Sequence, residues 1–143
     1  MNKLEEAILI AVQAHAGVTD KGGAPYILHP LRVMLKMREE PERIVAVLHD
    51  VVEDTDWTFA ALREKGFSEE VVTAIDHLTR RPEETYEEFV ERAVRHPIAR
   101  AVKIADVEDN LDLSRIAEPT ERDHARRARY EHALERLRRQ EPV

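Results

Sequence analysis

The segment LHDVVEDT places one histidine and three carboxylates in a stretch that otherwise belongs in a hydrophobic core. The apolar run Ile44–Leu48 is followed within six positions by His49, Asp50, Glu53 and Asp54. On a helix, Glu53 lies one turn beyond both His49 and Asp50, so the four form one polar patch. Burying unpaired charge is costly, and three carboxylates cannot neutralise one another beside a single imidazole. A helix end emerging into solvent would explain the two later acids but not His49 and Asp50, so the pattern favours a bound divalent metal ion.

A second segment, AVKIADVEDN, repeats this pattern more weakly. Asp106 follows a largely apolar run, and Asn110 stands one turn later on the same helical face. An Asp in a helix is usually exposed or paired with a nearby Lys or Arg, so this segment alone indicates little. Because the chain has no Cys, a metal ion must be held by imidazoles and carboxylates. Asp106 is therefore a candidate for a further ligand.

Helices must position these side chains, because apolar residues recur at helical spacing along most of the chain. Their starts are marked by proline in the first turn, by the capping-box spacing of Thr85 and Glu88, and by Thr120 as a cap. The expected fold is all-α, with about eight helices at residues 2–15, 30–37, 41–55, 58–65, 68–79, 85–95, 97–113 and 120–139.

Composition agrees with an all-α fold. Leu, Ile, Val and Ala are plentiful, whereas Gly is only 4 and aromatic residues make up 5%. A chain of 143 residues without internal repeats or linkers is expected to form one domain, residues 1–143. No apolar run approaches the ~20 residues that span a bilayer, and MNKLEEAILIAV does not resemble a signal peptide. We therefore expect a cytoplasmic protein without a membrane partner.

Net charge is −7, which argues against a nonspecific nucleic-acid binder. A polyanionic small substrate remains compatible with this charge if a metal ion and a few cations hold it locally. Residues 122–139 contain seven arginines against three acids. The ordinary interpretation is a solvated face of the last helix. The alternative is that Arg126, Arg127 and Tyr130 reach the phosphates or base of a ligand.

Three segments carry a resemblance to a known family. KGGAPYILHP, LHDVVEDT and KIADVEDN, in this order and at these spacings, resemble the motifs of the hydrolase domain of the Rel/SpoT alarmone enzymes and of the small alarmone hydrolases. With similar helical spacing around them, the resemblance covers most of residues 10–115. It implies a single HD-type helical domain, without the synthetase and regulatory domains of the long enzymes.

The resemblance also implies roles for individual residues. The implied ligands of an Mn²⁺ ion are His29, His49, Asp50 and Asp106. Two imidazoles and two carboxylates suit such an ion and leave positions open for water and substrate.

The acidic pair Glu53 and Asp54 matches the family's pair that activates or orients the attacking water. Lys21, Tyr26 and Asn110 match positions that line the nucleotide site. Tyr130, outside these motifs, is a further candidate for substrate binding. His15 also lies outside the motifs, and we interpret it as structural.

The chain also departs from the family pattern. Asp20 stands where the long enzymes usually have an Arg next to the Lys, and Val18 stands where they often have Gln. In the third motif, Val107, Glu108 and Asp109 replace residues that are usually basic, apolar and aromatic or His. The metal chemistry should survive these changes, whereas the preference for a base is left open.

The implied activity is metal-dependent removal of the 3′-pyrophosphate from guanosine tetra- and pentaphosphate, leaving GDP or GTP. The ion would lower the pKa of a bound water from about 15.7 towards roughly 7, and Glu53 or Asp54 would handle the proton. One alternative is an HD phosphohydrolase of an adenine alarmone or a nucleoside monophosphate. Another is a catalytically weak nucleotide sensor that meets a partner through its Arg-rich last helix. No oligomeric state is predicted.

Overall fold

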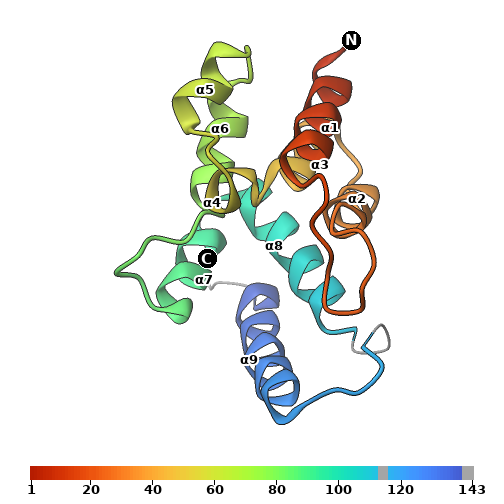
Figure 1. The fold of residues 1–143 in the computed structure, drawn as a ribbon. Coiled ribbons are helices and arrows are strands. Elements are labelled where there is room, and N and C mark those ends of the chain that lie inside the picture. The colour runs from red at the N-terminus through yellow and green to blue at the C-terminus, as the bar shows by residue number, and fades with distance from the viewer. Residues whose placement is uncertain (113–115, 140–143) are drawn as a thin grey trace.

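The computed structural model describes residues 1–112 and 116–139. These residues form nine helices and no strand (Figure 1). In chain order they are α1 (Lys3–Ala14), α2 (Leu28–Leu35), α3 (Glu40–Leu48), α4 (Val51–Asp54), α5 (Phe59–Glu64), α6 (Glu69–Asp76), α7 (Tyr86–Val94), α8 (Pro97–Asn110) and α9 (Glu121–Arg138). The predicted all-α fold is confirmed.

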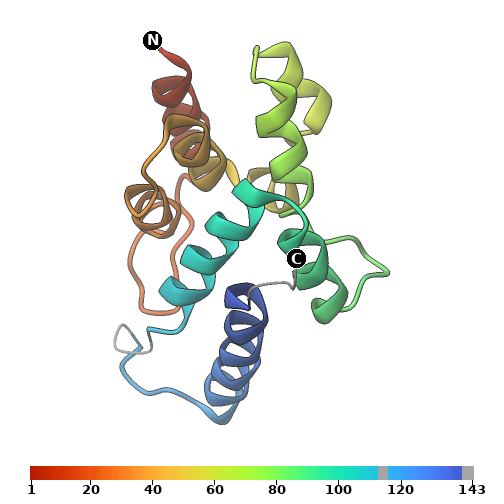
Figure 2. The same cartoon turned by 180° about the vertical axis from the view of Figure 1, so that it is seen from behind.

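Helix α8 is the centre of the arrangement. It runs between the group formed by α1, α2 and α3 on one side and the pair α7 and α9 on the other, as both views show (Figures 1 and 2). It packs against α2, α3, α6, α7 and α9. Helix α3 packs in turn against α1, α2 and α6. Because α2, α3 and α8 contact one another in pairs, polar residues on their facing sides are brought together in the interior.

The helix starts follow the sequence signals. Thr85 caps α7 and Thr120 caps α9, and in both helices the third residue returns the bond to form a capping box. Pro97 is the first residue of α8, where its missing N–H costs nothing because that N–H has no partner within the helix. These three predicted helix starts are confirmed to within one residue, whereas α8 ends at Asn110, before the predicted residue 113.

The third predicted helix is interrupted. Residues 41–55 were expected to form one helix, but α3 ends at Leu48 and α4 begins at Val51. Asp50 has φ −115° and ψ 10°, which lies outside the helical region. The break falls at the two polar residues that end the apolar run, and it changes the direction of the chain there. The prediction of a continuous helix was therefore wrong.

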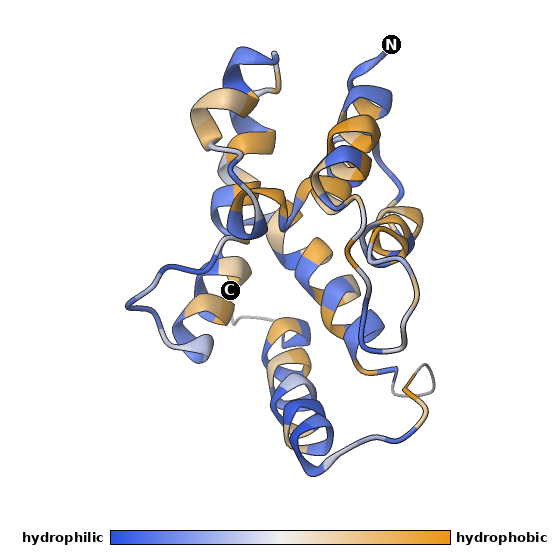
Figure 3. Cartoon of the chain, in the orientation of Figure 1, coloured by the Kyte–Doolittle hydropathy of each residue, from blue (hydrophilic) through white to orange (hydrophobic). Residues whose placement is uncertain are grey.

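Hydropathy follows the packing (Figure 3). The core includes fully buried Val45, Val47 and Leu48 of α3 and Val102 of α8. On α9, Ala133, Leu134 and Leu137 are buried, whereas most of the preceding part of the helix is exposed and hydrophilic. Among the helices described, none combines the length and apolar character needed to cross a membrane.

Candidate active site

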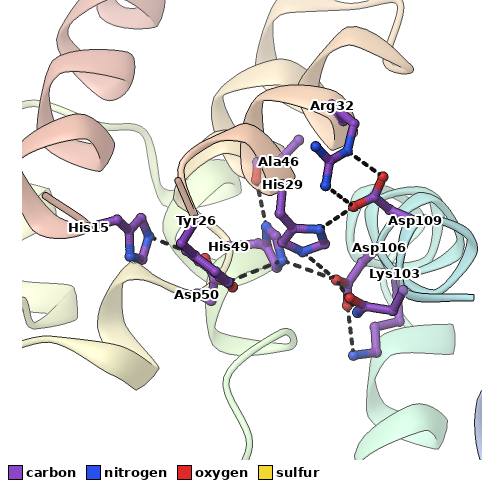
Figure 4. Close-up of polar contacts among 11 residues, drawn as sticks. His15, Tyr26, His29, Arg32, Ala46, His49, Asp50, Lys103, Asp106 and Asp109 are labelled. Carbon is purple, nitrogen blue, oxygen red and sulfur yellow. Dashed lines mark hydrogen bonds and ion pairs between the residues drawn. The ribbon is translucent and has the colours of Figure 1, made fainter. Parts of the chain in front are cut away.

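Four predicted metal ligands converge where α2, α8 and the joint between α3 and α4 meet (Figure 4). His29 comes from α2, His49 and Asp50 form the joint, and Asp106 lies on α8; all four are buried. Ligand atoms of His29, His49 and Asp50 lie within 4.8 Å of one another. Oδ1 of Asp106 is 2.9 Å from Nε2 of His29 and 3.4 Å from Nε2 of His49. The four side chains could thus share one divalent ion.

Both imidazoles are oriented through their other ring nitrogen. Nδ1 of His29 lies 2.6 Å from Oδ2 of Asp109, and Nδ1 of His49 lies 2.6 Å from the carbonyl oxygen of Ala46. These acceptors require Nδ1 to donate, so in the neutral imidazoles Nε2 carries the lone pair. Each Nε2 points into the cluster, as metal ligation requires.

The charges of the cluster support the metal interpretation. Burial by itself would lower the pKa of His49, but Asp50 and the contact with Asp106 raise it to about 10. Burial would raise the pKa of Asp50, but His49, the nearby His15 and the hydrogen bond from Tyr26 hold it below its usual range. A proton on His49 therefore balances the carboxylates. A divalent cation could take over that role, and its binding would then release protons.

The donor set fits a divalent metal ion. Buried nitrogen and oxygen donors without thiolate are the ligands that Mn²⁺ and similar ions accept. Oδ1 of Asp50 is buried without a hydrogen-bond partner, although Nε2 of His15 lies 3.5 Å away. Its other oxygen accepts a hydrogen bond from the Tyr26 hydroxyl. A buried carboxylate oxygen that lacks a donor is suited to a cation.

The predicted acidic pair lies beside this cluster on α4. Glu53 and Asp54 are both exposed and line the same pocket as the metal ligands. The backbone N–H of Arg80 donates to Oε1 of Glu53 at 2.8 Å. Partial desolvation of Asp54 by the pocket wall, together with the charges of Asp50 and Glu53, raises its pKa. A raised carboxylate pKa moves the group towards neutral pH, which suits a proton acceptor.

Two adjoining pockets surround the site. The metal-side pocket, about 330 Å³, is lined by the metal ligands and the acidic pair together with Tyr26, Arg80, Tyr86, Lys103, Asn110, Arg129 and Tyr130. The outer pocket, about 470 Å³, is lined by the loop before α2 and by the near face of α9. Tyr26, Asn110 and Tyr130 line both pockets, so one elongated ligand could occupy the two together. Lys21 lines the outer pocket, and its Nζ contacts Asp123 at 3.0 Å.

Several known proteins are similar to this chain in sequence. No family model matches the chain. The guanosine-3′,5′-bis(diphosphate) 3′-pyrophosphohydrolase of Aquifex aeolicus is 31% identical over 76% of this chain and 17% of its own length. A probable GTP pyrophosphokinase of Mycobacterium leprae is 32% identical over 88% of this chain and 17% of its own length. The bifunctional (p)ppGpp synthase/hydrolase SpoT of Escherichia coli is 31% identical over 78% of this chain and 18% of its own length.

A solved structure extends the match to three dimensions. A metazoan orthologue of SpoT, described as hydrolysing ppGpp, superposes with a TM-score of 0.80 over 96% of this chain and 86% of its own, at 26% identity. The chain is a homologue of the Rel/SpoT hydrolase domain. The Rel/SpoT relatives named above are much longer, since the chain spans only 17–18% of their length.

Sequence reasoning missed several residues of this Rel/SpoT-like site. Asp109 was identified only as a departure from the family motif, yet it is buried and accepts from His29 and from the guanidinium of Arg32 at 2.7 and 3.0 Å. His15, interpreted as structural, is buried next to Asp50. The spacing of Asp109 and Asp106, three residues apart on one helix, was the available signal. Arg32 gave none, because its partner lies on another helix.

Lys103 was also missed. It is buried on α8, with Nζ 3.0 Å from Oδ2 of Asp106 and 4.6 Å from the centre of the Phe89 ring. Burial would lower the pKa of Lys103, but Asp106 raises it, so the amine stays charged. It therefore balances one oxygen of Asp106 while Oδ1 faces the two histidines.

Proposed function

We propose that this chain is a 3′-pyrophosphohydrolase of guanosine tetra- and pentaphosphate that requires Mn²⁺. The observation that carries the proposal is the convergence of two Nε2 atoms and two carboxylates on the wall of a pocket that shares lining residues with a second pocket. Lys21, Arg126 and Arg127 line that second pocket. Homology to the Rel/SpoT hydrolase domain and the fold of the metazoan orthologue, described as hydrolysing ppGpp, support the choice of substrate. We take residues 1–143 to act as one hydrolase domain.

In this proposal His29, His49, Asp50 and Asp106 hold the ion. Asp109 and the carbonyl of Ala46 fix the two imidazoles with Nε2 facing inward. When bound, a divalent ion would acidify a coordinated water and polarise the phosphoryl group under attack.

Proton transfer falls to the acidic pair. Glu53 is held by the backbone of Arg80, and the raised pKa of Asp54 suits it to accept a proton from the attacking water. The proton can then pass to the 3′-oxygen of the departing nucleoside, so that a nucleotide with a free 3′-hydroxyl and pyrophosphate are released. Lys103 and Arg129 line the pocket near this point and place positive charge where the phosphates must lie.

The nucleoside is assigned to the outer pocket. Tyr26, Asn110 and Tyr130 would contact the sugar between the two pockets, and Lys21 would face the nucleotide beyond them. Arg126 and Arg127 line the same pocket and offer charge for 5′-phosphates.

The test measures release of pyrophosphate and of orthophosphate from a panel of nucleotides. Purified protein loaded with Mn²⁺ is given guanosine tetraphosphate, its adenine counterpart and a nucleoside monophosphate, each with and without a chelator. We expect pyrophosphate from guanosine tetraphosphate only when metal is present. Turnover of the monophosphate alone would indicate a different HD phosphohydrolase, and tight binding without turnover would indicate a sensor.

A further inference from the structure

The loop before α2 carries a carboxylate in the pocket assigned to the nucleoside. Asp20 lines the outer pocket together with Val18, Thr19, Lys21 and Gly22. A carboxylate there is unexpected, because a phosphate-rich ligand is repelled by it. By the motif resemblance, the long Rel/SpoT enzymes usually have an arginine at this position.

Asp20 is held rigidly by its own loop. Its Oδ1 accepts from the backbone N–H groups of Gly22 at 2.9 Å and Ala24 at 3.0 Å. Its backbone N–H donates to the carbonyl of Ala24 at 2.8 Å, and its carbonyl accepts from Gly23 at 3.0 Å. Gly23 has φ +85°, which favours glycine at this turn. The carboxylate is thus fixed in orientation before any ligand binds.

One carboxylate oxygen remains available. Over residues 1–112 and 116–139, no group donates a hydrogen bond to Oδ2 of Asp20. Asp123, another carboxylate of the outer pocket, is already engaged by Lys21 at 3.0 Å and by Thr120 at 2.8 Å. A ligand group that meets Asp20 must therefore bring a donor, since an ionised carboxylate only accepts.

The two walls of the outer pocket suit different parts of a nucleotide. The wall formed by α9 contributes Arg126 and Arg127, which suit phosphates. The loop wall contributes Lys21, which pairs with Asp123 of α9 at 3.0 Å, and Asp20 beside the half-exposed Val18. Oδ2 of Asp20 and the Val18 side chain suit a flat base that carries donors on its edge. The 5′-phosphates are thus expected towards α9 and the base towards the loop.

We propose that Asp20 selects guanine over adenine, an inference that rests on the hydrolase function proposed above. Guanine presents an N1–H and an N2 amino group side by side, and both can donate to a carboxylate. Adenine presents a lone pair at N1, which a carboxylate repels. Because Oδ1 is occupied by the loop, Oδ2 accepts from this edge of guanine. Asp20 thus stands where the long enzymes usually have an arginine, and it accepts hydrogen bonds from the base.

Asp20→Asn is the matched substitution. The amide oxygen can still accept from Gly22 and Ala24, so the loop is retained, whereas the second position becomes an NH2 group that cannot accept. We expect KM for guanosine tetraphosphate to rise about 10- to 100-fold, as for loss of a hydrogen bond to a charged group, with kcat nearly unchanged. KM for the adenine counterpart should stay equal or fall. Glu64→Gln, the same charge change at an exposed residue of α5, should alter neither value.

A substrate lacking one donor tests the proposal without a mutation. The inosine counterpart has no N2 amino group, so wild-type protein should show a KM several-fold above that for the guanosine compound, and Asp20→Asn should abolish this difference. Equal KM values for guanosine and inosine compounds in wild type, or unchanged base preference in Asp20→Asn with its melting temperature preserved, would overturn the proposal. Absence of turnover of every substrate by wild type would instead contradict the hydrolase function.

Discussion

Substitutions of the carboxylates of the site are expected to affect metal binding and kcat differently. Asp50 is a proposed ligand, so Asp50→Ala should lose bound Mn²⁺ and activity together. Glu53→Gln keeps size and hydrogen-bonding capacity but removes basicity, so metal should stay bound while kcat falls by roughly 100- to 10,000-fold. Metal content and kcat of each purified variant provide the measurement.

Asp54→Asn completes this comparison. If the acidic pair acts as one unit, Asp54→Asn should resemble Glu53→Gln, and the double variant should lose far less than the product of the two single losses. Near-normal kcat in both single variants, or metal loss as complete as in Asp50→Ala, would contradict the proposed division of roles.

Asp109 is expected to control metal affinity without touching the ion. It accepts from both His29 and Arg32, and an asparagine has only one oxygen with which to replace these bonds. Asp109→Asn should weaken Mn²⁺ binding about 10- to 100-fold, with activity recovered at high Mn²⁺. Glu108→Gln is the control, because it removes the same charge from the adjacent residue, which pairs with Arg138 instead. Equal Mn²⁺ affinity of the two variants would refute this role.

Arg92 of α7 stabilises the connection between α6 and α7 through hydrogen bonds. Its guanidinium donates to the carboxylate of Glu84 at 2.5 and 2.8 Å and to the carbonyl oxygens of Asp76 and Thr79 at 2.9 and 2.8 Å. The same connection carries Arg80, whose backbone holds Glu53. The connection therefore supports Glu53, a proposed proton acceptor, as well as the fold.

This contact predicts a pH dependence of stability. The bond from Arg92 lowers the pKa of Glu84 to about 2, below the ordinary value of about 4.3. Because the folded-state pKa is depressed, the stabilisation is fully present above the unfolded-state pKa and is lost as pH falls from about 4.3 to about 2. Melting temperatures should therefore fall more steeply in wild type than in Glu84→Gln across this range. Glu83→Gln, at an exposed neighbour, should follow wild type.

The helix positions were largely predictable from sequence, but the joint between α3 and α4 was not. Caps such as Thr85 and Thr120 act within one turn, so a sequence reports them directly. The break at Asp50 is different, because the apolar pattern continues to Val51 on its far side and gives no sign of a change in direction.

The same limit applies to the site. The proposed ligands were identified as candidates because they stand in recognisable segments. The contacts of His15 with Asp50 and of Arg32 with Asp109 join different parts of the chain, so they depend on how the helices pack. Local spacing does not report such contacts.

For the whole molecule, metal binding should appear as thermal stability. A ligand that binds only the folded state stabilises it, and at 100 times Kd the gain is about 2.7 kcal/mol. For a chain of this length, that corresponds to a rise in melting temperature of roughly 5–10 °C. We expect Mn²⁺ to produce this rise in wild type, a chelator to reverse it, and Asp50→Ala to show none. An identical rise in Asp50→Ala would place the ion elsewhere.

The joint between α3 and α4 has a consequence for how the centre tolerates change. His49 and Asp50 are neighbours in the chain, so their Cα atoms stay about 3.8 Å apart whatever the helices around them do. Their distances to His29 and Asp106, by contrast, depend on the packing of α2 and α8 against α3. The spacing of His49 and Asp50 is thus limited by covalent bonds, whereas the positions of His29 and Asp106 relative to them depend on tertiary contacts. Loosened packing between α2 and α8 should therefore weaken the binding of an added divalent ion while the chain is still folded, so that loss of metal binding should precede unfolding of the core.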